Sequence, residues 1–236
     1  MHTPRQIRFG PLDAVALEAG SPEKIAVFCH GFGAPGTDLV PIGEELARLA
    51  GPSAAATTFL FPAALLSLAE VGWGDARAWW MIDVARLQAG SPDAAVEMLR
   101  KERPDGAVAA GDQLEEFLAA AHTHYGCDAA GLTLGGFSQG AMLSAEVAMR
   151  LETPPRLLAL FSGALVSESV WQEWAGRLTG TAIVQAHGRQ DMVLPYASAE
   201  ALRGLLTDAG CEVSFVPFDG GHTIVVDALR EVAAKL

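Results

Sequence analysis

Residues 131–151 read GLTLGGFSQGAMLSAEVAMRL, and this stretch decides the fold. Residues 131–137 form a short apolar run, as expected of a buried strand, and residues 141–151 predict a helix. Between them, GFSQG at 136–140 matches the G-x-S-x-G pattern of a sharp strand-to-helix turn. Small neighbours allow such a turn to hold its serine in a strained conformation. The stretch predicts Ser138 as a nucleophile; the alternative is a glycine-rich turn with Ser138 as a helix N-cap.

The same alternation of strand and helix runs through the rest of the chain. KIAVFC at Lys24–Cys29 is expected to be a strand, and a helix is expected over Thr37–Leu49 with Thr37 as its N-cap. Most central strands are apolar on both faces, as in a parallel sheet covered by helices on both sides. Two short runs, Gln6–Leu12 and Asp13–Glu18, predict an antiparallel hairpin at the edge. The expected fold class is α/β: a mostly parallel central sheet in a three-layer sandwich. Further strands are expected at 55–61, 131–137, 157–161, 181–186 and 212–217, and further helices at 92–101, 107–124, 141–151, 169–178, 197–209 and 223–235.

Length, composition and charge exclude several classes of protein. The 236 residues, 50% of them hydrophobic, are expected to form a single domain over 1–236 with no large cap domain. A net charge of -12 argues against nucleic-acid binding, because the chain would repel phosphates. Stable membrane insertion is not expected, because the longest apolar stretch, 157–166, is ten residues and a span needs about 20.

The start of the chain and its cysteines give weaker indications. MHTPRQIRFG contains no apolar signal core, so a cytoplasmic location is expected. Cys29, Cys127 and Cys211 are odd in number and have no CxxC spacing, so we expect free thiols rather than a disulfide framework or a zinc site.

A serine hydroxyl needs an adjacent base, which a third group orients. His222 follows the last expected strand, at the carboxyl edge of the sheet where the serine turn lies, and fits the role of base. Asp191 follows the strand before it and fits the role of acid, with Asp219 as a competing acid. His187 precedes the candidate acids and fits the base role badly. The sequence therefore predicts Ser138, Asp191 and His222 as a catalytic triad, the alternatives being a loop histidine and a turn-forming aspartate.

Two backbone N–H groups are candidates for stabilising an oxyanion. One belongs to Gln139, the residue after the nucleophile, and the other to Phe32, which lies between Gly31 and Gly33 after the first central strand. The alternative for this second loop is a glycine-rich turn without a ligand role. His30 is expected to brace the loop rather than to take part in chemistry.

With these motifs in view, the chain resembles the phospholipase/carboxylesterase family of α/β-hydrolases, which includes bacterial carboxylesterases and acyl-protein thioesterases. The resemblance rests on HGFGAPGTDL, ARAWWMID, LGGFSQGAM, LFSGAL, HGRQDMVLP and GGHTI, in order from about residue 24 to 225. It implies an α/β-hydrolase fold, a triad at Ser138, Asp191 and His222, oxyanion donors at Phe32 and Gln139, and no cofactor or metal.

The chain departs from the family pattern on the substrate side. Ala34-Pro35 stands where family members often carry Asp, and Met81-Ile82-Asp83 follows Trp79-Trp80 where the pattern usually has Trp-aromatic-Asp. Apolar side chains between residues 63 and 81 could line an acyl groove, and simple core packing is an equal alternative. Arg77 could meet an anionic group or be solvated. The groove candidates are Leu65, Leu66, Trp73, Trp79, Trp80 and Met81.

The expected activity is hydrolysis of small or single-chain carboxylic esters through an acyl-enzyme intermediate, with a neutral acyl ester or thioester as substrate. Acyl-protein thioesterase and lysophospholipase activities would use the same residues, so the sequence does not separate them from ester hydrolysis. A protein of another class, a non-catalytic small-molecule binder on the same fold, would have no need of a triad or of two oxyanion loops.

Overall fold

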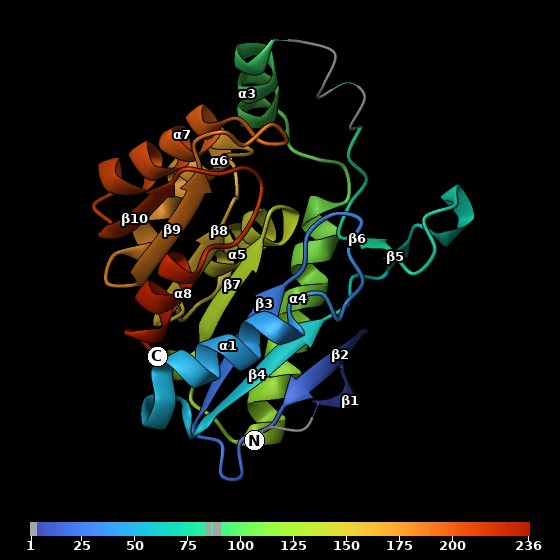
Figure 1. Ribbon diagram of the computed structural model, residues 1–236, viewed down its shortest axis with the longest axis vertical. Helices are drawn as coiled ribbons and strands as arrows, with labels where there is room; N and C mark the ends of the chain where they lie inside the picture. The colour runs from blue at the N-terminus through green and yellow to red at the C-terminus, as the bar shows by residue number, and fades with distance from the viewer. Residues whose placement is uncertain (1–3, 84–85, 87–90) are drawn as a thin grey trace.

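A computed structural model describes residues 4–83, 86 and 91–236. Eight strands form one sheet in the order β1-β2-β4-β3-β7-β8-β9-β10 (Figure 1). The strands are β1 (Pro4–Phe9), β2 (Leu12–Leu17), β3 (Lys24–Cys29), β4 (Thr57–Pro62), β7 (Thr133–Phe137), β8 (Leu157–Phe161), β9 (Ala182–Gly188) and β10 (Val213–Phe218).

Strand directions confirm the predicted fold class. β1 pairs with β2 and β2 with β4 in antiparallel fashion, whereas the five pairings from β4 through β3 to β10 are parallel. The hairpin lies at the edge of the sheet, as the sequence predicted. The carboxyl ends of β3, β7, β9 and β10 therefore lie along one edge, where the loops after parallel strands of such a sheet hold ligands.

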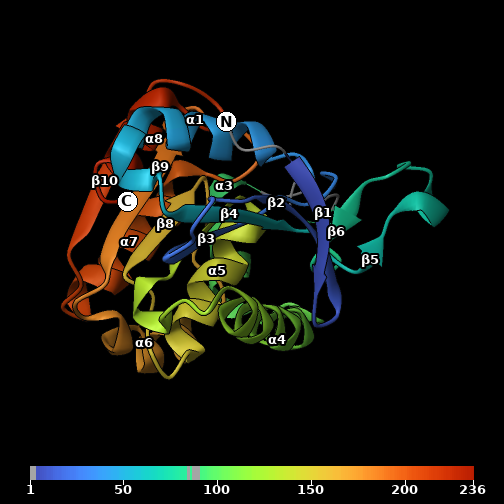
Figure 2. The same cartoon turned by 90° about the horizontal axis from the view of Figure 1, so that it is seen from below.

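Helices cover both faces of the sheet, as the view from below shows (Figure 2). One face carries α1 and α8, which pack with β4, β8 and β9 around side chains such as Phe59 and Phe161. The other carries α4, α5, α6 and α7, around a second core that includes Leu134 and Trp171. The helices are α1 (Val40–Ala50), α3 (Pro92–Lys101), α4 (Ala107–Tyr125), α5 (Gln139–Arg150), α6 (Glu168–Trp174), α7 (Tyr196–Asp208) and α8 (Val226–Ala233), with short 3-10 turns η1 (Gly51–Ala54), η2 (Ala69–Val71), η3 (Ala129–Gly131) and η4 (Ala175–Leu178).

The first helix begins later than predicted. Thr37 is not its N-cap, because α1 starts at Val40 and Leu39 occupies the cap position. A helix starting at Thr37 would place Pro41 beyond its first turn, where a backbone N–H is needed, and proline has none. Starting at Val40 places Pro41 in the first turn, where the missing N–H costs nothing.

The segment between β4 and α3 contains a small structure that the sequence did not predict. β5 (Leu66–Ser67) and β6 (Arg77–Ala78) pair as an antiparallel ribbon that projects from the body of the molecule (Figure 1). We call residues 63–81 the flap. A backbone bridge between Ala34 and Arg77 ties it to the loop after β3. Within the part of the chain described, no helix has the length and apolar character needed to cross a lipid bilayer.

Candidate active site

Ser138 lies in a strained turn between β7 and α5. Its φ of 54° and ψ of -117° lie outside the regions that L-residues ordinarily occupy. The flanking glycines permit a very close approach of β3 to this turn. A Cβ on Gly136 would lie 2.5 Å from the carbonyl carbon of Gly140 and 2.6 Å from the Cys29 carbonyl oxygen, and a Cβ on Gly140 would lie 2.5 Å from the His30 carbonyl oxygen. The glycines of GFSQG thus allow the serine turn and the loop after β3 to touch.

The structure brings Ser138, His222 and Asp191 together at the carboxyl edge of the sheet. His222 Nε2 lies 2.9 Å from Ser138 Oγ, and His222 Nδ1 lies 2.6 Å from Asp191 Oδ2. Asp191 follows β9, and His222 follows β10, so the two loops lie side by side beyond neighbouring strands. The ring of Phe137 packs against the His222 imidazole, with centroids 4.7 Å apart. This arrangement can pass a proton from the serine hydroxyl to the imidazole.

Hydrogen bonds around Asp191 fix which imidazole nitrogen carries the proton. Burial raises the pKa of Asp191, but the hydrogen bonds from His222, Leu194 and Val193 outweigh it and leave the pKa below its ordinary value. An ionised carboxylate only accepts hydrogen bonds, so His222 Nδ1 must carry a proton and donate it. The Nε2 lone pair then faces the serine hydroxyl and can accept its proton.

The loops that carry Asp191 and His222 are joined by their backbones. The N–H of Arg189 donates to the Phe218 carbonyl at 2.9 Å, and the N–H of Gln190 donates to the Gly220 carbonyl at 3.0 Å. Asp219, the competing acid of the sequence analysis, has a side chain that is 86% exposed and lies 3.8 Å from Arg189. It therefore points away from the buried pair that Asp191 and His222 form.

The predicted oxyanion donors also lie beside the nucleophile. Neither the Phe32 N–H nor the Gln139 N–H has an acceptor among the described residues, so both remain able to bind an incoming oxygen. A Cβ on Gly31 would lie 3.4 Å from Ser138 Cβ, which shows how closely the loop passes the serine. Two unpaired donors at this position are what an oxyanion requires.

His30 braces the loop after β3. Its Nδ1 lies 2.8 Å from the Gly31 carbonyl, its Nε2 accepts from the Ala64 N–H at 3.1 Å, and its carbonyl accepts from Trp79 Nε1 at 2.9 Å. Burial lowers the pKa of His30, which keeps the imidazole neutral and able to accept at Nε2. The histidine therefore fixes both the loop after β3 and the base of the flap.

The side chain of Gln139 has a role that the sequence analysis missed. Its Oε1 accepts from the Trp79 N–H at 3.0 Å, and its Nε2 donates to the Trp80 carbonyl at 2.8 Å. Because Gln139 is also the expected oxyanion donor, this clamp joins the flap to the site.

The structure divides the predicted groove residues into two groups. Trp79 and Trp80 are buried in the core beside α4 and α5, so they pack the protein interior rather than line an open groove. The physical reason is the Gln139 clamp, which holds their backbone against the start of α5. The four others carry exposed apolar surface: Leu65, Leu66, Trp73 and Met81.

Trp73 is the exposed flap residue with a direct link to the oxyanion loop. Its indole meets the Phe32 ring edge-on, with centroids 5.8 Å apart, and a Cβ on Gly33 would lie 3.0 Å from it. The side chain is still 52% exposed. It therefore offers an apolar surface beside one of the expected oxyanion donors.

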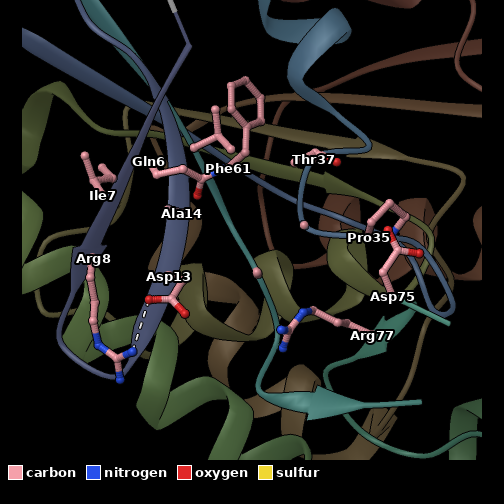
Figure 3. A pocket seen from close by; sticks show the side chains of 13 residues that line it. Gln6, Ile7, Arg8, Asp13, Ala14, Pro35, Thr37, Phe61, Asp75 and Arg77 are labelled. Atoms are coloured by element: carbon pink, nitrogen blue, oxygen red, sulfur yellow. Dashed lines mark hydrogen bonds and ion pairs between the residues drawn. The ribbon is translucent and has the colours of Figure 1, made fainter. Parts of the chain in front are cut away.

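Arg77 faces a different pocket, of about 560 Å³, between the oxyanion loop and the β1–β2 hairpin (Figure 3). Arg8 and Asp13 form an ion pair on one side of it, and Asp75 and Arg77 lie on the other. Arg77 Nη1 donates to the Ala64 carbonyl at 2.8 Å. The pocket lining contains no member of the Ser138 group, so Arg77 braces the flap away from the nucleophile.

Two further residues support the site without having been predicted. Ser162 has a φ of 48°, and its hydroxyl donates to the Thr223 carbonyl at 3.1 Å, next to His222. His187 Nε2 lies 3.3 Å from Asp191 Oδ2, the oxygen that His222 also contacts. FSGAL and HGRQD contain these residues, but their contacts join strands distant in sequence. The described residues include no group of three or more His, Cys, Asp or Glu side chains arranged to hold a metal ion.

The sequence model of the phospholipase/carboxylesterase family matches residues 12–236. The chain belongs to the phospholipase/carboxylesterase family. Its fold and its family make it an α/β-hydrolase of the carboxylesterase and thioesterase type, as the motifs predicted. No curated protein matches the chain significantly.

Solved structures of similar proteins agree with this family. The esterase PE8 is 28% identical, with a TM-score of 0.78 over 94% of this chain and 96% of that one. A carboxylesterase from Mesorhizobium loti is 20% identical, with a TM-score of 0.74 over 98% of this chain and 97% of that one. The F65L variant of Arabidopsis thaliana SOBER1 is 20% identical, with a TM-score of 0.72 over 90% of this chain and 97% of that one. The last two likenesses concern the fold alone.

Proposed function

We propose that this hydrolase is a serine carboxylesterase that cleaves small or single-chain acyl esters through an acyl-enzyme intermediate. The observation that carries the proposal is the hydrogen-bonded series from Ser138 Oγ through His222 to Asp191, at 2.9 Å and 2.6 Å. These are the distances that proton transfer from a nucleophile to a general base requires.

The proposed reaction has two halves. Ser138 Oγ attacks the acyl carbonyl carbon while His222 Nε2 takes the hydroxyl proton, and the carbonyl π electrons move to oxygen. The Phe32 and Gln139 N–H groups stabilise that oxyanion. The C–O bond to the leaving alkoxide then breaks as His222 returns the proton to it. Water, deprotonated by His222, attacks the acyl-enzyme, and the second collapse releases the carboxylic acid and restores the serine.

Asp191 stabilises the imidazolium that exists between these transfers. Its charge lies 2.6 Å from His222 Nδ1 in a buried site, where the low dielectric strengthens the interaction. Hydrogen bonds from the backbone N–H groups of Val193 and Leu194 to Oδ1 keep the carboxylate ionised and fixed in orientation.

The surroundings favour a neutral, apolar acyl group. Exposed flap residues stand on the oxyanion-loop side of the site, and Met192 and Val193, directly after Asp191, are exposed on the other. With a net charge of -12, the protein as a whole disfavours a polyanionic substrate.

The experiment is labelling with a fluorophosphonate, whose phosphorus is attacked by an activated serine with loss of fluoride. We expect one adduct per wild-type chain by intact mass, none in Ser138→Ala, and unchanged labelling in Ser53→Ala, a control serine exposed on η1. Labelling that survives Ser138→Ala would disprove the assignment of the nucleophile.

A matched series of p-nitrophenyl esters and acyl thioesters of increasing chain length then determines the substrate class. Higher kcat/KM for esters supports the proposal, and higher kcat/KM for thioesters identifies a thioesterase that uses the same residues. Binding without turnover in every series would overturn both and indicate a non-catalytic binder.

A further inference from the structure

His187 is a buried histidine that the proposed proton relay does not use. It lies near the end of β9, opposite Pro217 of β10, with no exposed surface. Its Nε2 lies 2.9 Å from the Leu194 carbonyl oxygen and 3.3 Å from Asp191 Oδ2. The Tyr196 ring meets its imidazole edge-on, with centroids 6.1 Å apart.

The contacts of His187 determine its protonation. The Leu194 carbonyl can only accept a hydrogen bond, so Nε2 must carry a proton. Nδ1 is buried and has no hydrogen-bond partner among the described residues, so a proton there would be an unpaired donor. Burial lowers the pKa of His187, and the nearby His222 lowers it further, against the opposing effects of the Leu194 carbonyl, Asp191 and the Gly163 carbonyl. The residue is therefore a neutral imidazole with its one N–H at Nε2.

Asp191 consequently receives hydrogen bonds on both oxygens. Oδ1 accepts from the N–H groups of Val193 and Leu194 at 2.8 Å and 2.9 Å. Oδ2 accepts from His222 Nδ1 and also faces the Nε2–H of His187. Oδ2 of the carboxylate thus faces two imidazoles, of which His222 belongs to the proposed proton relay and His187 does not.

We propose that His187 is a positioning residue for Asp191: its Nε2–H, which donates to the Leu194 carbonyl and lies 3.3 Å from Asp191 Oδ2, helps to fix the direction and moderates the charge of the oxygen that faces His222. The inference rests on the proposed function, because it concerns how the acid of that triad is held. His187 touches no reacting atom and acts only through Asp191.

Loss of this N–H has two consequences of known sign. Asp191 Oδ2 loses the nearby N–H dipole of His187, so more of its charge is directed at His222 and the imidazolium is favoured. The acidic limb of the kcat/KM profile, on which the base is protonated, then moves to higher pH. The position of Asp191 Oδ2 is also held by fewer contacts, so kcat falls, while KM stays because no substrate contact is lost.

Few ionisable groups surround these atoms in the described part of the chain. Asp191 faces the two imidazoles, His222 and His187. His187 faces the phenol ring of Tyr196, over which the Arg189 guanidinium lies at 5.3 Å. The shift in the profile is therefore expected to come from the change at Asp191 Oδ2.

The experiment compares three substitutions of His187 in the full chain. His187→Leu removes the donor, His187→Asn has an amide too short to reach the Nε2 position, and His187→Gln can place an amide N–H there. We expect kcat of the first two to fall about tenfold, the size expected when one polar contact near a buried charge is lost. Their KM stays within about twofold, and the midpoint of the acidic limb of their kcat/KM profile moves to higher pH. His187→Gln should recover most of the lost kcat and most of the shift in that midpoint.

A matched control is His122→Gln. This histidine is half-buried on α4 and also lies near a backbone carbonyl, that of Cys127, but near the opposite edge of the sheet. Its substitution should leave kcat, KM and the midpoint unchanged. Urea unfolding of every variant separates loss of stability from loss of positioning, and if His187→Leu does not fold, the comparison of His187→Asn with His187→Gln decides.

The outcomes separate this inference from the proposed function. If the wild type is not labelled by fluorophosphonate at Ser138, the proposed function fails. If the wild type is labelled and active, but the His187 variants change only stability and keep the wild-type midpoint, the positioning role is refuted. The same conclusion follows if His187→Gln is no better than His187→Asn.

Discussion

Substituting Gly140 by alanine tests whether the close approach of β3 to α5 builds the site. Gly140 is the second residue of α5, and a Cβ there would overlap the carbonyl oxygen of Cys29 and lie 2.5 Å from the carbonyl oxygen of His30. Ordinary contact begins at 3.4 Å. Both obstacles are backbone atoms at the end of β3, so no side chain can turn aside to relieve the clash.

The geometry sets the size of the expected effect. The helix start and the end of β3 must separate by about 1 Å, and a misplacement of that size at a catalytic centre costs about 100-fold in rate. The separation moves the Phe32 N–H away from the Gln139 N–H, so one oxyanion cannot meet both. Overpacking of this kind also lowers the free energy of unfolding by about 1–3 kcal/mol or more.

Gly204→Ala is the matched control. Gly204 lies inside α7, and a Cβ there meets nothing within 4 Å. Alanine is the better helix former, so this variant should gain about 0.5–1 kcal/mol of stability and keep full activity. Urea unfolding gives the stability, and p-nitrophenyl ester hydrolysis with the rate of fluorophosphonate labelling gives the activity. Gly140→Ala activity within about threefold of wild type, with unreduced stability, would refute the reasoning.

Two further measurements test the buried histidines and the flap. Burial lowers the pKa of His30 and His187 below the ordinary value of 6.5. As the pH falls, these histidines therefore become protonated in the unfolded chain at a higher pH than in the folded protein. The free energy of unfolding should consequently fall as the pH drops below about 6.5. Each histidine can contribute a slope of at most about 1.4 kcal/mol per pH unit, measured by urea unfolding, and a flat profile from pH 7 to 5 would contradict the prediction. Trp73→Ala should raise KM about tenfold for esters whose acyl chain is long enough to cover about 50 Å² of the indole. Acetate esters should keep their KM. An equal change of KM for both kinds of ester would show that Trp73 binds no acyl chain.

Much of the fold followed from local sequence patterns. The strands at Lys24–Cys29 and Leu157–Phe161 have the predicted bounds, because continuous apolar runs between turn residues admit one interpretation in an alternating chain. The helix predicted from Thr37 began at Val40 instead, because the position of Pro41 overrides the apolar spacing. The β5–β6 ribbon has two residues in each strand, too few to show a period, and it forms through pairing across the flap.

The candidate site also contains residues that sequence patterns could predict and contacts that they could not. Ser138, Asp191 and His222 could be predicted to lie together because the G-x-S-x-G motif marks the serine and the ends of β7, β9 and β10 share one edge of a parallel sheet. The groups that hold them were not found, because their partners are remote in the chain. His187 belongs to the HGRQD motif, yet nothing local shows that its Nε2 faces Asp191.

Gln139 shows why such contacts follow from burial. Its side chain is fully buried at the start of α5, so each polar atom needs a partner, and the backbone of Trp79 and Trp80 supplies both. That requirement draws two large aromatic residues into the core and leaves the exposed Trp73 next to Phe32. The residue whose backbone N–H we propose as an oxyanion donor therefore also fixes the flap that we propose meets the acyl group. Substitutions of its side chain should affect oxyanion stabilisation and acyl binding together.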